Sequence, residues 1–372
     1  MKRIKILQVN KLYYPAIGGI ETVVKNIAEN LNGCTDMKVL VCQKSGKASM
    51  DVVSGVKVTR ATSFGTFYSM PISLDFLVKM HKAAREADIV VCHMPFPLGD
   101  LGCLLSRTKK KVVVWWHSDI VRQKKLMLFY KPIMEIFLKR ADVIIAATEG
   151  HIEYSTYLTP YKNKCVVIPY GVEQKFVEDS KAYCFKRKKE NEEIVFLFVG
   201  RFVYYKGCDV LIKAFANTHS SKLIMAGSGI LENELRKLCK ELNIEDRVEF
   251  VILPTDNQIM ELYRKCDVFV LPSTEKSEAF GLVQLEAMCY GKPVINTRLK
   301  SGVPYVSIDD LTGITVEPKN QQQLADAIQR LTDNTAEREQ FGKAAKKRVL
   351  ENFTMNSSMN KFYKCISELN SK

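Results

Sequence analysis

The chain has 372 residues, more than one hydrophobic core usually serves, so two domains are expected. Apolar residues make up 47% and charged residues 26%, as in ordinary folded proteins, and the formal net charge is +14. No apolar stretch approaches the length that spans a bilayer, so the sequence excludes an integral membrane protein and we expect a cytoplasmic one.

The 11 cysteines contain no C-x-x-C pair, so neither a zinc cluster nor a redox pair is indicated. We expect reduced, mostly buried thiols. The N-terminal MKRIKILQVNKLYYP has an apolar run too short for a signal sequence, and it predicts a first buried strand instead.

Short apolar runs alternate with amphipathic ones through the first half of the chain, which indicates a parallel sheet with helices on both faces. The expected strands are 4–9, 37–42, 88–93, 111–117 and 142–148, and helices are expected at 20–31 and 73–87. A charged segment with Pro and Gly, residues 168–193, shows no apolar periodicity and reads as a linker.

The same alternation restarts after residue 193. Strands are expected at 194–200, 222–227, 248–252, 268–272 and 292–297, with helices at 209–218, 230–243, 256–266, 282–290 and 323–333. The sequence therefore predicts an α/β protein with two doubly wound, Rossmann-like domains, 1–175 and 190–352, whose strand C-termini face a central cleft.

Residues 107–140 carry ten basic and two acidic side chains, a local charge of +8, interleaved with Leu, Met, Phe and Tyr. That composition is typical of a helix touching anionic lipid. An ordinary amphipathic helix with its apolar side in the core explains the pattern equally well. Nucleic-acid binding is the least favoured interpretation of this basic segment, because no zinc finger or RNA-binding aromatic motif is present.

Two glycine-containing loops follow expected strands. Gly18 and Gly19 precede a helix and would let backbone amides approach a phosphate, although a tight turn explains them too. They do not form G-x-G-x-x-G, so no dinucleotide fingerprint is present. In FVGRFVYYKGCD, Arg201 and Lys206 follow a strand at its C-terminal end, where their charges suit a diphosphate; two solvated loop cations are the alternative.

The stretch SEAFGLVQLE places two carboxylates around a helix start. Amides at Phe280, Gly281 and Leu282 would point at an anion, with the helix dipole behind them. Glu278 lies before that helix and suits sugar hydroxyls, while Glu286 lies one turn inside it and could accept both hydroxyls of a ribose. A capping acid and a solvated helix residue are the plain alternatives.

Residues 277–295, together with VGRFVYYKG and GGIE, closely resemble the retaining glycosyltransferases of family 4 (group 1), which have the GT-B fold. The resemblance runs along nearly the whole chain. It implies that Glu278 binds the donor sugar and Glu286 the ribose, that Arg201 and Lys206 bind the diphosphate, and that Gly18–Gly19 is the glycine loop. It also implies that the final segment, 353–372, packs back on the first domain.

In the same family a histidine after the fourth strand contacts the donor sugar, which implies that role for His117; a satisfied core histidine is the alternative. The segments HSDIVRQKKLM and SGVPYVS resemble bacterial O-antigen and exopolysaccharide enzymes, where mannosyl- and rhamnosyltransferases are frequent. The middle of the arginine motif departs from the family, because Tyr204 and Tyr205 replace small or acidic residues. They either cover the loop or touch acceptor, and the role of Asp119 is equally open.

No Asp-x-Asp triplet occurs, so no metal or other cofactor is expected. The resemblance implies a metal-independent, retaining hexosyltransferase at the cytoplasmic membrane face. Its expected donor is GDP-mannose and its expected acceptor a saccharide on polyprenyl diphosphate. The alternatives are a UDP- or dTDP-sugar, a soluble acceptor, or a non-catalytic nucleotide-sugar-binding partner subunit. The sequence carries no indication of oligomeric state.

Overall fold

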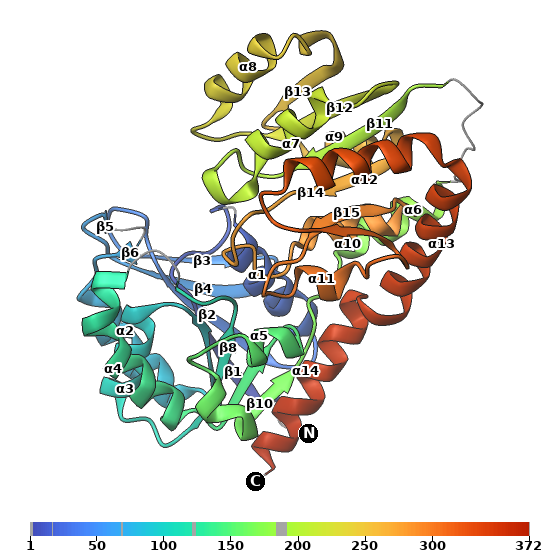
Figure 1. Cartoon of the computed structure of the whole chain (residues 1–372). Helices are drawn as coiled ribbons and strands as arrows, with labels where there is room; N and C mark the ends of the chain where they lie inside the picture. The colour runs from blue at the N-terminus through green and yellow to red at the C-terminus, as the bar shows by residue number, and fades with distance from the viewer. Residues whose placement is uncertain (1–2, 17, 68–69, 121–123, 184–191, 372) are drawn as a thin grey trace. The chain divides into compact units, whose positions relative to one another are not determined.

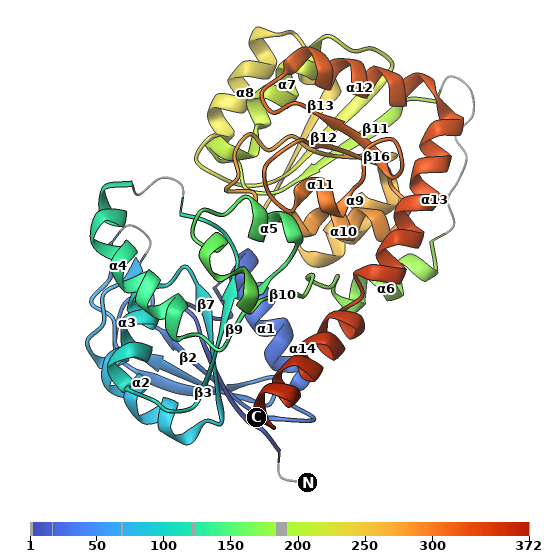
Figure 2. The same cartoon turned by 60° about the horizontal axis from the view of Figure 1, so that its bottom comes forward.

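The computed structural model describes residues 3–16, 18–67, 70–120, 124–183 and 192–371, with the side chains of 124–126 left out (Figures 1 and 2). The chain divides into two units. Unit 1 comprises Met1–Tyr170 and Asn356–Lys372, and unit 2 comprises Gly171–Met355. Each unit is built on its own mainly parallel sheet.

The sheet of unit 1 has eight strands in the order β10-β9-β8-β7-β1-β2-β4-β3, and every neighbouring pair is parallel except β3 and β4. A separate two-stranded hairpin, β5–β6, follows β4. The strands are β1 (Lys5–Val9), β2 (Asp36–Cys42), β3 (Ser49–Val53), β4 (Val56–Ala61), β5 (Thr66–Phe67), β6 (Met70–Pro71), β7 (Ile89–Met94), β8 (Lys111–Trp116), β9 (Val143–Ala146) and β10 (Cys165–Val167).

Helices cover both faces of this sheet (Figure 2). On one face α2, α3 and α4 share a hydrophobic core with the strands. On the other, α14 packs Phe362 against Trp115, with ring centroids 5.0 Å apart. The helices are α1 (Gly19–Leu31), α2 (Asp75–Glu86), α3 (Pro97–Ser106), α4 (Lys124–Arg140), α5 (Glu149–Glu153), η1 (Thr159–Lys164, 3-10) and α14 (Met355–Asn370).

The sheet of unit 2 has six parallel strands in the order β13-β12-β11-β14-β15-β16. The chain builds outward from β11 to β13 and then returns to place β14 on the other side of β11. Ligands bind in doubly wound sheets where the strand order reverses in this way. The strands are β11 (Ile194–Val199), β12 (Ser221–Gly227), β13 (Val248–Ile252), β14 (Val268–Leu271), β15 (Val294–Thr297) and β16 (Gly313–Val316).

The core of unit 2 joins strand residues such as Phe196 and Ile295 to α7, α8 and α12. The helices of unit 2 are α6 (Gln174–Lys181), η2 (Tyr204–Lys206, 3-10), α7 (Cys208–Ala216), α8 (Glu232–Glu241), η3 (Glu245–Arg247, 3-10), α9 (Asp256–Lys265), α10 (Leu282–Cys289), α11 (Val303–Val306), α12 (Gln321–Asp333) and α13 (Thr335–Asn352).

The α/β fold with two doubly wound sheets is confirmed. The interpretation of 168–193 as a linker without periodicity was wrong in part, because α6 lies within it and buries Phe176 and Val177. Phe176 packs edge-on against Tyr263 of α9, with ring centroids 6.0 Å apart. The charge run at 184–191 lies outside the described residues. None of the ten cysteines that the structure describes forms a disulfide.

Candidate functional site

The reversal of strand order in unit 2 puts two loops next to each other. The loop after β11 carries Arg201 and Lys206, and the loop after β14 leads to Glu278. Gly207 lets the first loop press against the second: its φ is +67°, and a side chain there would collide with the Pro272 carbonyl oxygen. The backbone N–H of Thr274 donates to the Tyr205 carbonyl at 2.7 Å and fixes the contact.

Lys206 and Glu278 form a buried ion pair between these loops. Lys206 Nζ lies 2.6 Å from Glu278 Oε2, and each residue is 8% exposed. The Ser273 hydroxyl donates to the same carboxylate oxygen at 2.9 Å. Burial alone would lower the pKa of Lys206, but the charge of Glu278 and its hydrogen bond outweigh burial, so the pKa is raised and the ammonium stays charged.

Arg201 is exposed, and its guanidinium is held by a neighbouring tyrosine. Arg201 Nη2 donates to the Tyr205 hydroxyl at 3.0 Å. The Tyr205 ring also stacks edge-on against Tyr204 and lies 5.7 Å from Lys206 Nζ. Within unit 2, Tyr205 therefore covers the loop and contacts both of its cations, Arg201 and Lys206. A contact of Tyr204 or Tyr205 with the acceptor stays a prediction.

The helix start expected after Glu278 is present. Gly281 is the N-cap of α10, with a φ of +72°, and its helix begins at Leu282. The cap makes no side-chain hydrogen bond, so the first-turn amides carry the positive end of the helix dipole without a capping side chain at that position. Phe280 is a core residue that packs edge-on against Phe353, which anchors the loop just before the helix.

Glu286 is not the solvated helix residue that the plain alternative supposed. It is half-buried, and the Tyr263 hydroxyl donates to its Oε2 at 2.8 Å. Burial raises the pKa of Glu286 to about 7; the Tyr263 hydrogen bond lowers it and the negative charge of Glu173 raises it further. The carboxyl group therefore changes its charge near neutral pH.

His117 lies in unit 1, just after β8, within a chain of buried side chains. His117 Nε2 lies 2.8 Å from His93 Nδ1, and His93 Nε2 lies 2.7 Å from Gln8 Oε1. On its other side, His117 Nδ1 lies 2.7 Å from the Tyr170 hydroxyl. The rings of His93, His117 and Tyr170 are stacked.

The proton positions in this hydrogen-bonded series of side chains can be assigned from Gln8 at one end. Burial lowers the pKa of His93 to about 3, and burial with the nearby His93 lowers that of His117 well below its usual range, so both rings are neutral. Gln8 Oε1 can only accept, so His93 donates from Nε2 and accepts from His117 at Nδ1. Tyr170 then donates to His117 Nδ1. Both ring nitrogens of His117 are engaged within unit 1, as in the core-histidine alternative, and its sugar contact stays a prediction.

The remaining residues from the sequence are also in unit 1. Asp119 accepts hydrogen bonds from Ser155 at 2.7 Å and from Trp116 Nε1 at 3.2 Å, so it joins the end of β8 to the segment after α5. Gly18 is the N-cap of α1, and Glu21 folds back into the space that a Gly18 side chain would fill. A carboxylate over this helix start weakens its attraction for phosphate.

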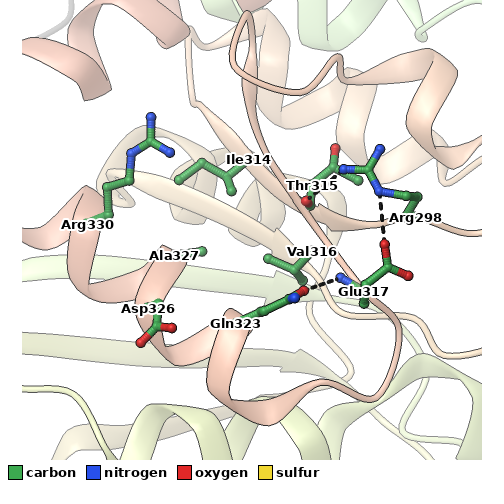
Figure 3. A pocket seen from close by; sticks show the side chains of 9 residues that line it. All are labelled: Arg298, Ile314, Thr315, Val316, Glu317, Gln323, Asp326, Ala327 and Arg330. Atoms are coloured by element: carbon green, nitrogen blue, oxygen red, sulfur yellow. Dashed lines mark hydrogen bonds and ion pairs between the residues drawn. The ribbon is translucent and has the colours of Figure 1, made fainter.

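A depression of about 340 Å³ lies between β16 and α12 (Figure 3). Arg298 donates to Glu317 at 3.1 Å and to Asp309 at 2.8 Å, and Arg330 pairs with Glu337. Because acidic side chains already neutralise both guanidiniums, this depression does not suit an anionic nucleotide. The switch point of unit 2 is the better candidate.

Sequence reasoning missed Tyr263, Ser273, Gln8, His93 and Tyr170. Ser273 lies only five positions before its partner Glu278. The other four contact their partners from distant segments of the chain, so no local motif marks them. Within the described ranges, no three His, Cys, Asp or Glu side chains come together as a metal-ligand set. Across those same ranges, no helix combines the length and hydropathy needed to cross a membrane.

Residues 17–176 match the family described as Glycosyltransferase Family 4, and residues 179–348 match Glycosyl transferases group 1. The chain is 32% identical over 356 residues to O-antigen chain mannosyltransferase C of Escherichia coli, covering 94% of each. It is 31% identical over 353 residues to D-rhamnosyltransferase WbpZ of Pseudomonas aeruginosa, covering 94% of this chain and 92% of the relative.

Solved structures share the fold at lower identity. Sucrose-phosphate synthase from Thermosynechococcus elongatus superposes with a TM-score of 0.81 at 22% identity, covering 99% of this chain and 100% of that chain. Anabaena Alr3699/HepE in complex with UDP gives a TM-score of 0.77 at 19% identity, covering 98% and 100%.

Proposed function

Because the chain belongs to the group 1 glycosyltransferases of family 4, with the GT-B fold, we propose that it transfers mannose from GDP-mannose to a saccharide on polyprenyl diphosphate. The family and the fold that the sequence indicated are confirmed. One observation carries the proposal: the buried Lys206–Glu278 pair at the switch point of unit 2, with Glu286 on the adjoining helix. Mannose is favoured by the mannosyltransferase relative, and GDP follows from that choice of sugar.

Different residues of the site bind different parts of the nucleotide-sugar. Arg201, Lys206 and the start of α10 offer positive charge to a leaving diphosphate. The Glu278 carboxylate accepts from sugar hydroxyls, and that of Glu286 accepts from the ribose. These charges stabilise the leaving group without a metal, so we propose that transfer proceeds in EDTA.

We propose transfer with retention of anomeric configuration. The bond from the sugar C1 to the diphosphate oxygen breaks, and a bond from C1 to the acceptor oxygen forms on the same face. The acceptor's proton passes to a diphosphate oxygen, so no protein base is required. The transition state has oxocarbenium character, and the diphosphate charge next to it is balanced by Arg201 and Lys206.

The proposed acceptor places the enzyme at the cytoplasmic membrane surface. Helix α4 presents Leu128, Phe129 and Ile136 outward beside Lys131 and Lys139. Apolar and basic side chains on one outer face suit anionic lipid. Of the expected basic segment, Arg122 and the side chains of Lys124 and Lys125 lie outside the described residues.

Radiolabelled GDP-mannose, offered with lipid-linked saccharides in EDTA, tests this proposal. We expect label in the lipid fraction, and release by an α-specific but not a β-specific mannosidase. UDP- or dTDP-sugars in place of GDP-mannose test the alternative donor, which the UDP-bound HepE structure favours. Label on a water-soluble saccharide alone would identify a soluble acceptor. Donor binding without transfer or hydrolysis would identify a non-catalytic subunit.

A further inference from the structure

The β5–β6 hairpin is a hydrogen-bonded projection from unit 1. The Thr62 N–H donates to Asp75 Oδ2 at 2.8 Å and closes its base. The Phe64 N–H donates to the Ile72 carbonyl at 3.0 Å, and Phe67 pairs with Met70. These backbone contacts tie the two strands of the hairpin to each other.

The outward side chains of this hairpin are large and apolar. Pro71 is buried, and the partly buried Met70 packs against the core of unit 1. Phe64 is 77% exposed, Phe67 60% and Ile72 52%. Single exposed apolar residues are ordinary on protein surfaces, but several on one short projection mark an interaction site.

Helix α2 continues the same surface. Leu74 and Val78 lie one helical turn apart and are each 72% exposed, while Phe76 and Met80 fill the core. One turn further along the outer face lies the exposed Lys82. The outer stripe of α2 thus begins apolar and ends basic.

The first turns of α4 lie beside the hairpin in both views (Figures 1 and 2). Leu128 is 77% exposed and Phe129 81% exposed. The exposed Lys131 lies next to them. The exposed apolar side chains of the three elements are here called the apolar rim: Phe64, Phe67, Ile72, Leu74, Val78, Leu128 and Phe129.

We infer that the β5–β6 hairpin is a second membrane-insertion element, which enters the headgroup–acyl boundary of an anionic bilayer together with α4. The inference rests on the proposed function, which uses α4 alone. Charge complementarity selects the bilayer as the occupant: Lys82, Arg85 and Lys139 are exposed on α2 and α4, and the chain carries a net charge of +14, although Lys131 pairs with the exposed Glu135 at 3.7 Å. Aromatic rings beside basic side chains suit that boundary.

Sedimentation with vesicles of phosphatidylcholine containing about a quarter phosphatidylglycerol tests the inference. Two variants separate the elements: Phe64→Ser with Phe67→Ser for the hairpin, and Leu128→Ser with Phe129→Ser for α4. Leu311→Ser with Leu350→Ser is the matched control, because both leucines are exposed on unit 2. A single cooperative thermal transition at the unfolding temperature of the parent shows that each variant is folded.

We expect the hairpin variant to lose about tenfold or more in vesicle partitioning, as the α4 variant does, and the control to bind as the parent does. A hairpin variant that binds like the parent while the α4 variant fails overturns the inference and leaves the proposed function intact. If both bind like the parent, the membrane contact of the proposed function also fails. If the hairpin variant changes only the sedimenting mass of the free protein, the apolar rim is an interface between copies and the inference is wrong.

Discussion

Lys206 and Glu278 hold each other in place at the switch point of unit 2: Nζ lies 2.6 Å from Oε2, and each side chain is 10% exposed. Breaking a buried pair by removing one partner leaves an uncompensated charge. A donor that inserts here must therefore keep the pair or replace it with equivalent contacts. In the proposed function, diphosphate oxygens would replace the pair for Lys206, and sugar hydroxyls would replace it for Glu278.

We expect Lys206→Ala to lower turnover by about a hundredfold or more, because a preorganised charge at the leaving group contributes mainly in the transition state. The measurement is release of nucleoside diphosphate at saturating donor. Thermal denaturation of the variant separates lost chemistry from lost fold. Unchanged turnover in a folded variant would show that Lys206 does not stabilise the leaving group.

Glu286→Ala should weaken binding of the free nucleoside diphosphate. A hydrogen bond to a charged group contributes roughly 1.5–3 kcal/mol, which is about tenfold or more in affinity. Calorimetric titration with GDP measures the loss. An unchanged dissociation constant would rule out the ribose contact.

Nucleotide affinity should also rise with pH. The pKa of Glu286 is raised to about 7, and only the carboxylate form accepts from both ribose hydroxyls. The dissociation constant for GDP should therefore fall between pH 6 and pH 8 by more in the parent than in Glu286→Gln, which reports the titration of the phosphate alone. Parallel pH profiles for the two proteins would contradict the assignment.

Asp100 makes stability depend on pH in unit 1. The Tyr130 hydroxyl of α4 donates to Asp100 Oδ2, and burial raises the pKa of Asp100 to about 8, against about 3.9 in an unfolded chain. The folded state holds this proton up to pH 8, whereas the unfolded state loses it near pH 4. The stability contribution is therefore complete below pH 4 and is lost as the pH rises to 8.

Asp100→Asn removes that titration and keeps an oxygen acceptor for Tyr130. We expect its free energy of unfolding to fall less than that of the parent between pH 5 and pH 8. Urea unfolding at the two pH values measures both proteins. Equal losses would mean that Asp100 ionises normally in the fold.

The sequence was sufficient wherever structure follows local spacing. Short apolar runs placed the strands, and the eight-residue interval put Glu278 before α10 and Glu286 inside it. Side-chain contacts between distant segments could not be predicted from the sequence. The Lys206–Glu278 contact exists because β11 and β14 are neighbours in the sheet, and strand order is a property of the assembled fold. The Tyr263 contact with Glu286 arises from the packing of α9 on α10 in the same way.

His117 shows the same limit in unit 1. Its position after β8 followed from the sequence, but its partners, His93 and Tyr170, come from β7 and from the segment after β10. Only the assembled sheet reveals that both ring nitrogens are engaged. Burial, too, cannot be read from spacing, and it is burial that moves the pKa of Glu286 toward neutrality.

The central claim is that unit 2 binds a nucleoside diphosphate sugar without a metal. A thermal-shift series with GDP, GDP-mannose, UDP and dTDP in EDTA tests it most directly. A ligand at a hundred times its dissociation constant adds about 2.7 kcal/mol of stability. We predict selective stabilisation by GDP and GDP-mannose, reduced in Glu286→Ala. Stabilisation by UDP or dTDP alone would contradict GDP-mannose as the donor. No response to any nucleotide would contradict nucleotide binding by unit 2.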